Sequence, residues 1–159
     1  MKAKLLFLFV FAAVLAGCKK SDFTTKPQVE IKSVKTAEII SSTGGMAKIY
    51  EFELTVTDKE GNAQGEIIID KLDAPLPACQ QNSFTEIFPM PEFPSETNQK
   101  VTVKVKYAYG GSVTGYSNLG ASLCTSPLEP HIAIFRFRVV DKGGDTSNAA
   151  QSDPITLPF

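Results

Sequence analysis

Residues 101–109 read VTVKVKYAY, a stretch in which apolar and polar side chains alternate. Successive side chains on a β-strand point to opposite faces of its sheet. Three valines and two tyrosines therefore share one face, whereas Thr102, Lys104 and Lys106 share the other. This pattern is typical of a strand with one face in the core and the other in solvent.

The same alternation recurs elsewhere, and no window shows the 3.6-residue period of a helix. The stretches KIYEFELTVTD (48–58) and FRFRVVD (135–141) are the clearest cases. Their inward side is expected to carry Tyr50, Phe52, Leu54, Val56, Phe135, Phe137 and Val139. The expected strands are residues 29–35, 46–57, 65–71, 84–88, 99–109, 131–141 and 153–158. The sequence thus predicts an all-β fold, a single β-sandwich of about seven antiparallel strands.

Two of these strands end in similar segments, DKEGN from Asp58 and DKGGD from Asp141. An aspartate at this position accepts hydrogen bonds from backbone amides two residues on, and the glycine supplies a positive φ. Both segments are typical of hairpin turns.

The stretch FRFRVVDKGGDTSNAAQSDPITL (135–157) resembles the last two strands of bacterial immunoglobulin-like and fibronectin-like modules. That resemblance implies an Ig-like β-sandwich over residues 27–159.

The N-terminal segment has the features of an export signal. Two lysines precede an unbroken apolar run of 12 residues, Leu5–Ala16, which is too short to span a bilayer. Leu15-Ala16-Gly17-Cys18 closely resembles the lipobox of bacterial lipoproteins. The resemblance implies that residues 1–17 are a cleaved signal peptide and that the lipidated Cys18 attaches the chain to a membrane. The alternative is ordinary cleavage after Ala16, which would leave Cys18 as a spare thiol.

Residues 18–26 are then a tether. In Gram-negative lipoproteins, lysine directly after the cysteine, here Lys19 and Lys20, implies the outer membrane, with the periplasmic or surface-facing side left open. Removal of residues 1–17 leaves 142 residues, enough for one domain. It also moves the net charge from −1 to −3, because Lys2 and Lys4 are lost. This acidity argues against a nucleic-acid partner.

Two further cysteines, Cys79 and Cys124, would lie in an oxidising compartment and are expected to form a disulfide. The closed loop of about 45 residues would stabilise the fold by roughly 4 kcal/mol. The alternative is a catalytic thiol, which needs a neighbouring base, and the chain has a single histidine, His131.

Long connections indicate where a ligand would bind. If successive strands alternate in direction, connections 72–97 and 110–130 share the end opposite the start of the first strand. They carry aromatic residues among Pro, Gly, Ser and Asn, a mixture typical of binding loops. Phe93, Tyr116 and Tyr109 are the predicted ligand-binding residues. The alternative is that Phe84 and Phe88 cap the open end of the sandwich and that the tyrosines pack beneath the cystine.

No catalytic, cofactor or metal site is expected. GGSVTG around Ser112 departs from the G-x-S-x-G nucleophile motif. Oxygen ligands for calcium occur in the DKEGN and DKGGD turns, but metal-free turn capping accounts for the same residues.

Two functional hypotheses follow. The first is a non-catalytic binding module that presents its membrane-distal loops to a glycan, a peptide or an envelope protein. The second is a structural or accessory lipoprotein that docks within an envelope assembly through a sheet face or edge. Exposed aromatic residues on the distal loops would favour the first hypothesis, and an unprotected edge strand would favour the second.

Overall fold

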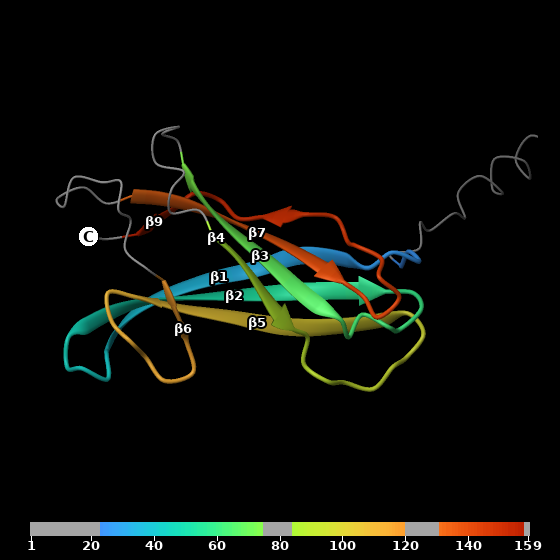
Figure 1. Ribbon diagram of the computed structural model, residues 1–159, viewed down its shortest axis with the longest axis horizontal. Coiled ribbons are helices and arrows are strands. Elements are labelled where there is room, and N and C mark those ends of the chain that lie inside the picture. Colours follow the sequence, from blue (N-terminus) through green and yellow to red (C-terminus); the bar gives the residue numbers. More distant parts are fainter. Residues whose placement is uncertain (1–22, 75–83, 120–130, 158–159) are drawn as a thin grey trace, which may run out of the picture.

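The computed structural model describes residues 23–74, 84–119 and 131–157, which form two β-sheets packed face to face (Figure 1). Sheet A has the strand order β1 (Gln28–Ile40), β2 (Met46–Asp58), β5 (Gln99–Tyr109) and β6 (Ser117–Leu119). Sheet B has the order β4 (Phe84–Pro89), β3 (Glu66–Ala74), β7 (His131–Val140) and β8 (Ala150–Gln151), and β9 (Ile155–Leu157) also pairs with β7. The predicted all-β class with two packed sheets is confirmed. Among the described residues, no helix has the length and apolar character that a membrane crossing requires.

The strand boundaries differ from the prediction in three places. β1 continues to Ile40 because its second half pairs with β2 residue by residue, from Lys35 opposite Glu51 to Ile40 opposite Met46. The short strands β6 and β8 were not predicted, since two or three residues are too few to show alternation. β6 is parallel to β5, so the expectation of antiparallel pairing throughout is wrong at that position.

The core lies between the sheets and is filled by the predicted inward residues. Phe52 of sheet A is fully buried, with its ring centroid 4.8 Å from that of Phe135 and 5.0 Å from that of Phe137, both in sheet B. Its ring and that of Tyr107 of β5 are nearly perpendicular, at a centroid distance of 6.5 Å. These rings interlock the two sheets at the centre of the sandwich.

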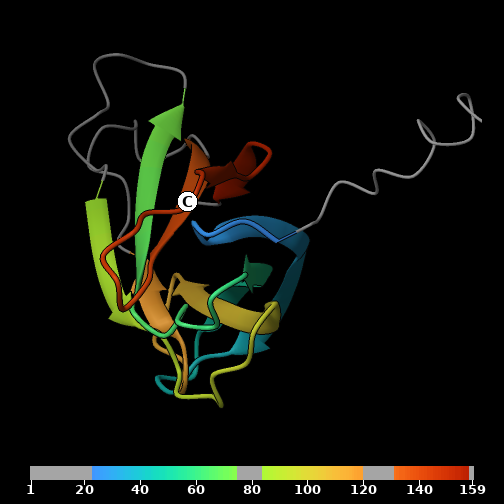
Figure 2. The same ribbon diagram turned by 90° about the vertical axis from the view of Figure 1, so that its right-hand side faces the viewer.

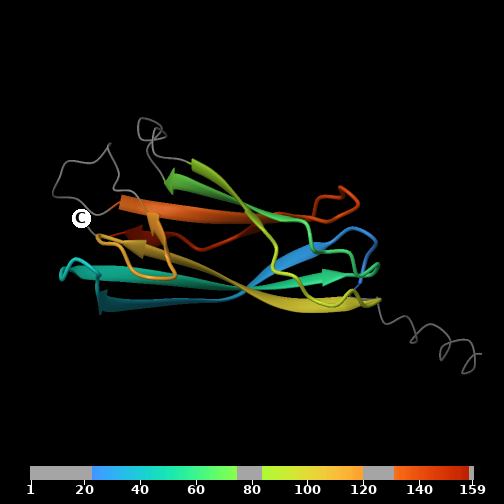
Figure 3. The same ribbon diagram turned by 60° about the horizontal axis from the view of Figure 1, so that its bottom comes forward.

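The two ends of the sandwich carry different connections (Figures 1 and 3). We call the end at which β1 begins the proximal end, where connections 59–65, 90–98 and 141–149 lie. Asn98 N donates to Lys59 O, and Lys142 N donates to Asn62 O, which ties these three connections together. The opposite, distal end carries the hairpin 41–45 and the loop 110–116, joined by Ser42 N donating to Ser112 O.

Both aspartate-containing turns cap as expected. Asp58 accepts hydrogen bonds from the amides of Glu60 and Asn62, and Gly61 has a φ of 76°. Asp141 accepts from the amide of Asp145 at 2.8 Å. The expectation of two hairpins is wrong for the first turn, because β2 belongs to sheet A and β3 to sheet B. That turn therefore carries the chain from one sheet to the other.

One side of the sandwich is closed by a side chain. The Asn148 amide accepts from Val29 N at 2.8 Å and donates to Val29 O at 2.9 Å, as a neighbouring strand would. It joins β1 of sheet A to the segment between β7 and β8 of sheet B, and these elements lie side by side in Figure 2. The other side, between β4 and β5, has no such bridge over its proximal half in the part of the chain described.

Replacing Phe52 with alanine should lower the free energy of unfolding by about 3–5 kcal/mol, because it removes the ring that both sheets contact. Urea denaturation followed by circular dichroism would measure this. The control is Ile40→Ala, at a residue 73% exposed, which should change the value by less than about 0.5 kcal/mol. Equal effects of the two substitutions would contradict the central role of Phe52.

Candidate functional site: a groove on the open side of the sandwich

The predicted ligand-binding residues do not lie on one surface. Tyr109 is at the distal end of β5 but points into the core and is only 6% exposed. Burial raises the pKa of its hydroxyl. It packs in the interior and is not presented on a loop.

Tyr116 lies on the outer face of sheet A, because the loop 110–116 folds back over that face. Its hydroxyl donates to Glu51 Oε1 at 2.6 Å, and Lys106 Nζ lies 5.4 Å from the centre of its ring. The hydrogen bond to Glu51 is the main reason that the pKa of Tyr116 is raised, and the same bond lowers the pKa of Glu51. Tyr116 is thus held at a fixed position beside β5.

Phe93 lies in the connection 90–98 at the proximal end, so the expectation that it shares an end with the loop of Tyr116 is wrong. The reason is that β4 is a full strand and returns the chain to the proximal end before residue 90. Gln64 donates a hydrogen bond to the backbone oxygen of Phe93. The half-buried ring of Phe93 packs against the core. The ligand-binding role of these three residues stays a prediction.

Cys18, Cys79 and Cys124 lie outside the described residues, so lipidation and the disulfide stay predictions. The described residues next to the two cysteine-containing segments are close together, since Ala74 at the end of β3 pairs with Ile132 at the start of β7. His131 begins β7 and pairs with Leu157.

A groove of about 420 Å³ lies on the open side, between β4 of sheet B and β5 of sheet A. Its floor is apolar because inward-facing residues of three strands meet there: Ile67 of β3, Phe88 of β4, and Val103 and Val105 of β5. Lys104, Lys106 and the 115–117 segment with Tyr116 form one wall, and Pro89 and Pro91 form the other. We refer to this hollow as the β4–β5 groove.

Tyr107 closes the distal end of the groove. Its buried hydroxyl donates to Glu86 Oε2 of β4 at 2.7 Å, and its ring centroid lies 6.3 Å from that of Phe84. Burial, followed by the hydrogen bond to Glu86, raises the pKa of Tyr107 far above its usual value. Phe84 and Phe88 thus pack on the open side of the sandwich, with Phe88 at the floor of the groove.

β5 forms the edge of sheet A along most of this groove. β2 pairs with it from Gln99 to Tyr109, whereas β6 covers only Tyr107–Tyr109 on the other side. Within the described chain, no other strand, loop or side chain hydrogen-bonds to the backbone of residues 100–106 on the groove side. Alternate N–H and C=O groups in this stretch therefore point toward the groove without a protein partner.

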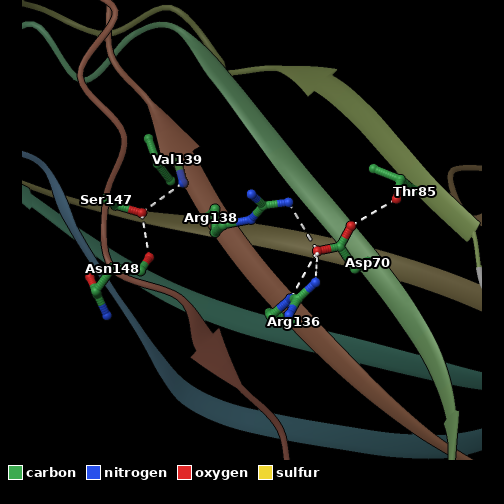
Figure 4. Close-up of polar contacts among 7 residues, drawn as sticks. All are labelled: Asp70, Thr85, Arg136, Arg138, Val139, Ser147 and Asn148. Atoms are coloured by element: carbon green, nitrogen blue, oxygen red, sulfur yellow. Dashed lines mark hydrogen bonds and ion pairs between the residues drawn. The ribbon is translucent and has the colours of Figure 1, made fainter.

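A second polar cluster lies on the outer face of sheet B (Figure 4). Asp70 of β3 accepts hydrogen bonds from Thr85 Oγ1 at 2.8 Å, Arg136 Nε at 2.9 Å and Arg138 at 3.1 Å. Its side chain is 6% exposed, and each arginine is at least a third exposed. Burial by itself would raise the pKa of Asp70, but the hydrogen bonds from Thr85 and Arg136 and the two positive charges together lower it. The cluster links β4, β3 and β7 and stabilises sheet B.

The described residues offer no grouped set of three His, Cys, Asp or Glu side chains for a metal ion. The carboxylates of Asp58 and Asp141 accept from backbone amides of their own turns. No model of a known family, curated protein or solved structure matches the chain.

Sequence reasoning did not identify the β4–β5 groove as a site. Alternation correctly placed Lys104 and Lys106 on the solvent side of β5, and Phe88 was assigned to a short strand. What it lacked was the strand order, because local alternation does not reveal which strands lie at the edges of their sheets.

Asp70→Asn should lower the free energy of unfolding at pH 7 by about 1–2 kcal/mol, since it removes a charge that three donors share. The native pKa of Asp70 lies below its unfolded value of about 3.9. Ionised Asp70 therefore contributes to the free energy of unfolding above its unfolded pKa, and this contribution is lost as the pH falls through the native pKa. Urea unfolding at pH 7 and at about pH 2 should show the difference from wild type shrinking toward zero at the lower pH. Asp153→Asn, at an exposed carboxylate, is the matched control and should have little effect at either pH.

Proposed function

We propose that this protein is a membrane-anchored envelope lipoprotein of a Gram-negative bacterium and that its Ig-like domain is a non-catalytic binding module. The sequence Leu15-Ala16-Gly17-Cys18 supports the anchor, because a cysteine follows small residues directly after a short apolar run. Lys19 and Lys20 support an outer-membrane location. The anchored chain would enter the sandwich at the proximal end, where β1 begins.

The strand order supports an Ig-like type of sandwich. β1, β2 and β5 form one sheet, and β3, β7 and β9 belong to the other, as strands A, B, E and C, F, G do in Ig domains. β4 extends the second sheet beside β3, which is the position of the C′ strand in variable-type domains.

The β4–β5 groove is the single observation that carries the binding proposal. It combines an apolar floor with polar groups at its rim, which is the composition of most ligand sites in proteins. The three aromatic residues predicted to bind a ligand do not form a shared surface. Tyr109 is buried, Tyr116 is hydrogen-bonded to Glu51, and Phe93 lies at the proximal end. The module would thus bind an envelope partner, a glycan or a protein, along its side.

A docking role within an envelope assembly is the second candidate. The edge of β5 at residues 100–106, which no described strand pairs with, agrees with it, and the outer face of sheet B adds a second observation. Ile87 is 58% exposed and Ile132 37% exposed on the outer face of sheet B. Ile68 lies next to Ile87 on the neighbouring strand, so these two residues form an apolar pair. Ile132 pairs with Ala74 nearer the distal end, and the Asp70 cluster lies between it and Ile68. Exposed apolar residues on a sheet face are typical of protein contacts.

Cys18→Ala should abolish the anchor. In cells grown with labelled palmitate, the wild-type protein should incorporate label and sediment with outer membranes, because two or three acyl chains hold a protein on a bilayer stably. The variant should incorporate no label and should leave the membrane fraction. Label retained in the variant would contradict lipidation of this cysteine.

Lys104→Ser/Lys106→Ser should weaken binding of an envelope partner at least tenfold, since both side chains line the β4–β5 groove. The measurement is capture from whole-envelope extract and on a glycan array. Lys26→Ser/Lys59→Ser removes the same charge at the proximal end and is the matched control. Undiminished binding by the groove variant would place the site elsewhere, with the outer face of sheet B as the next candidate.

A further inference from the structure

We propose that the free edge of β5 receives an extended acidic segment of a different protein, which adds to sheet A as a further strand. The proposal takes its location from the proposed function and adds the class of ligand and the mode of binding.

The backbone of this stretch is available for strand addition. Strand addition gains its affinity from main-chain hydrogen bonds to an exposed edge, and the groove side of β5 has those groups unpaired within the described chain. β6 begins to cover the edge at Tyr107, so the free stretch is seven residues long, from Lys100 to Lys106. At about 3.3 Å per residue this is roughly 23 Å, the length of an ordinary strand.

The other edges carry features that block such pairing. β4 is short, ends at Pro89 and points the charged Glu86 inward, and each of these features protects an edge. β1 has Val29 bonded to Asn148 and an irregularity in its register between Ile31 and Ser33. The remainder of β1 carries charges of both signs, Lys35 and Glu38, whereas the charged residues of β5 at the groove are all lysines.

The side chains of the groove specify an alternating ligand. Residues of an added strand that face inward would contact the apolar floor formed by Ile67, Phe88, Val103 and Val105. Residues that face outward would lie beside Lys104 and Lys106 on the solvent face, where opposite charges in neighbouring strands attract. The matching sequence therefore has apolar residues at every second position and acidic residues between them.

The neighbouring glutamates neutralise the lysines of β5 only in part. Glu51 Oε1 forms an ion pair with Lys106 Nζ at 3.8 Å, but Glu51 also lies opposite Lys35 and accepts from Tyr116. Glu53 lies opposite Lys104 but forms its ion pair with Lys32 at 2.6 Å. Each glutamate is thus shared between two lysines, which leaves excess positive charge at the β5 edge.

The same lysines argue against a second copy of β5 as the occupant. Pairing β5 with itself would place lysines of one copy beside lysines of the other, and like charges on adjacent strands are unfavourable. An acidic segment of another protein meets no such repulsion.

The test uses residues 18–159 with Cys18→Ala and three kinds of seven-residue peptide with blocked ends. The first is EVEVEVE and the second is KVKVKVK. The third kind comprises two methylated forms of EVEVEVE, one with backbone N-methyl groups on all valines and the other with them on all glutamates. Binding is followed by NMR shifts and by hydrogen-exchange protection of those amides of residues 100–106 that face the groove; the alternate amides face β2 and are protected in the free protein.

We expect EVEVEVE to bind and to protect these amides, and we expect KVKVKVK to bind at least tenfold more weakly. One of the two methylated peptides should lose binding and the other should retain it, because alternate N–H groups of a strand face opposite sides. Lys104→Ser/Lys106→Ser should weaken EVEVEVE binding severalfold, whereas Lys26→Ser/Lys59→Ser should leave it unchanged.

Four results would overturn the proposal: no binding of EVEVEVE at millimolar concentration, equal binding of the basic peptide, an equal effect of the two methylations, or protection, already in the free protein, of those amides of residues 100–106 that face the groove and not β2. The last result would mean that a second copy or another part of the chain already occupies the edge. If the peptide fails while Lys104→Ser/Lys106→Ser still loses its envelope partner, strand addition is wrong and the groove remains the binding site. If neither shows an effect, the proposed function fails as well.

Discussion

The packing of Phe52 against Phe135 and Phe137 is the contact on which the rest of the structure depends. Each sheet has one apolar face, and neither face is stable in water unless it is covered by the other. Aromatic side chains bury large areas, so a few rings from β2, β5 and β7 hold the two sheets at a fixed separation. With the centre fixed in this way, the two sides of the sandwich can differ. Asn148 closes one side, and the other remains open as a groove.

The edge strands on the two sides, β1 and β5, differ in how their outward backbone groups are treated. A sheet edge exposes unpaired backbone groups, which attract other strands. On the closed side, the Asn148 side chain satisfies the backbone of Val29 and replaces a neighbouring strand. On the open side, the groove-facing backbone groups of residues 100–106 have no partner among the described residues, and lysines lie next to them. Lysines on an edge strand reduce pairing between copies. Under the proposed strand addition, the same lysines would attract a chain of opposite charge.

Much of the fold could be predicted from the sequence, because alternation is a local property. Residues such as Leu54, Val103 and Phe137 occupy the core as expected, and Asp58 caps its turn as expected. Strand order is not a local property, so the sequence pattern at Asp58 predicts a hairpin although the turn carries the chain between the two sheets. For the same reason Phe93 was placed at the wrong end and the edge position of β5 was missed. The position of Tyr116 depends on a loop folding back onto Glu51, a contact between residues 65 positions apart.

The positions of the chain ends within the sandwich have a mechanical consequence. β1 begins at the proximal end, and β9 ends beside the start of β7 at the distal end (Figure 1). Tension applied between Gln28 and Leu157 would therefore act along the strands and not across them. Under such a load, β1 would be drawn along β2 and β9 along β7, so the hydrogen bonds of each ladder would share the force. A domain held at one end by lipid and pulled at the other would resist extension by shear, a geometry that favours slow unfolding under force.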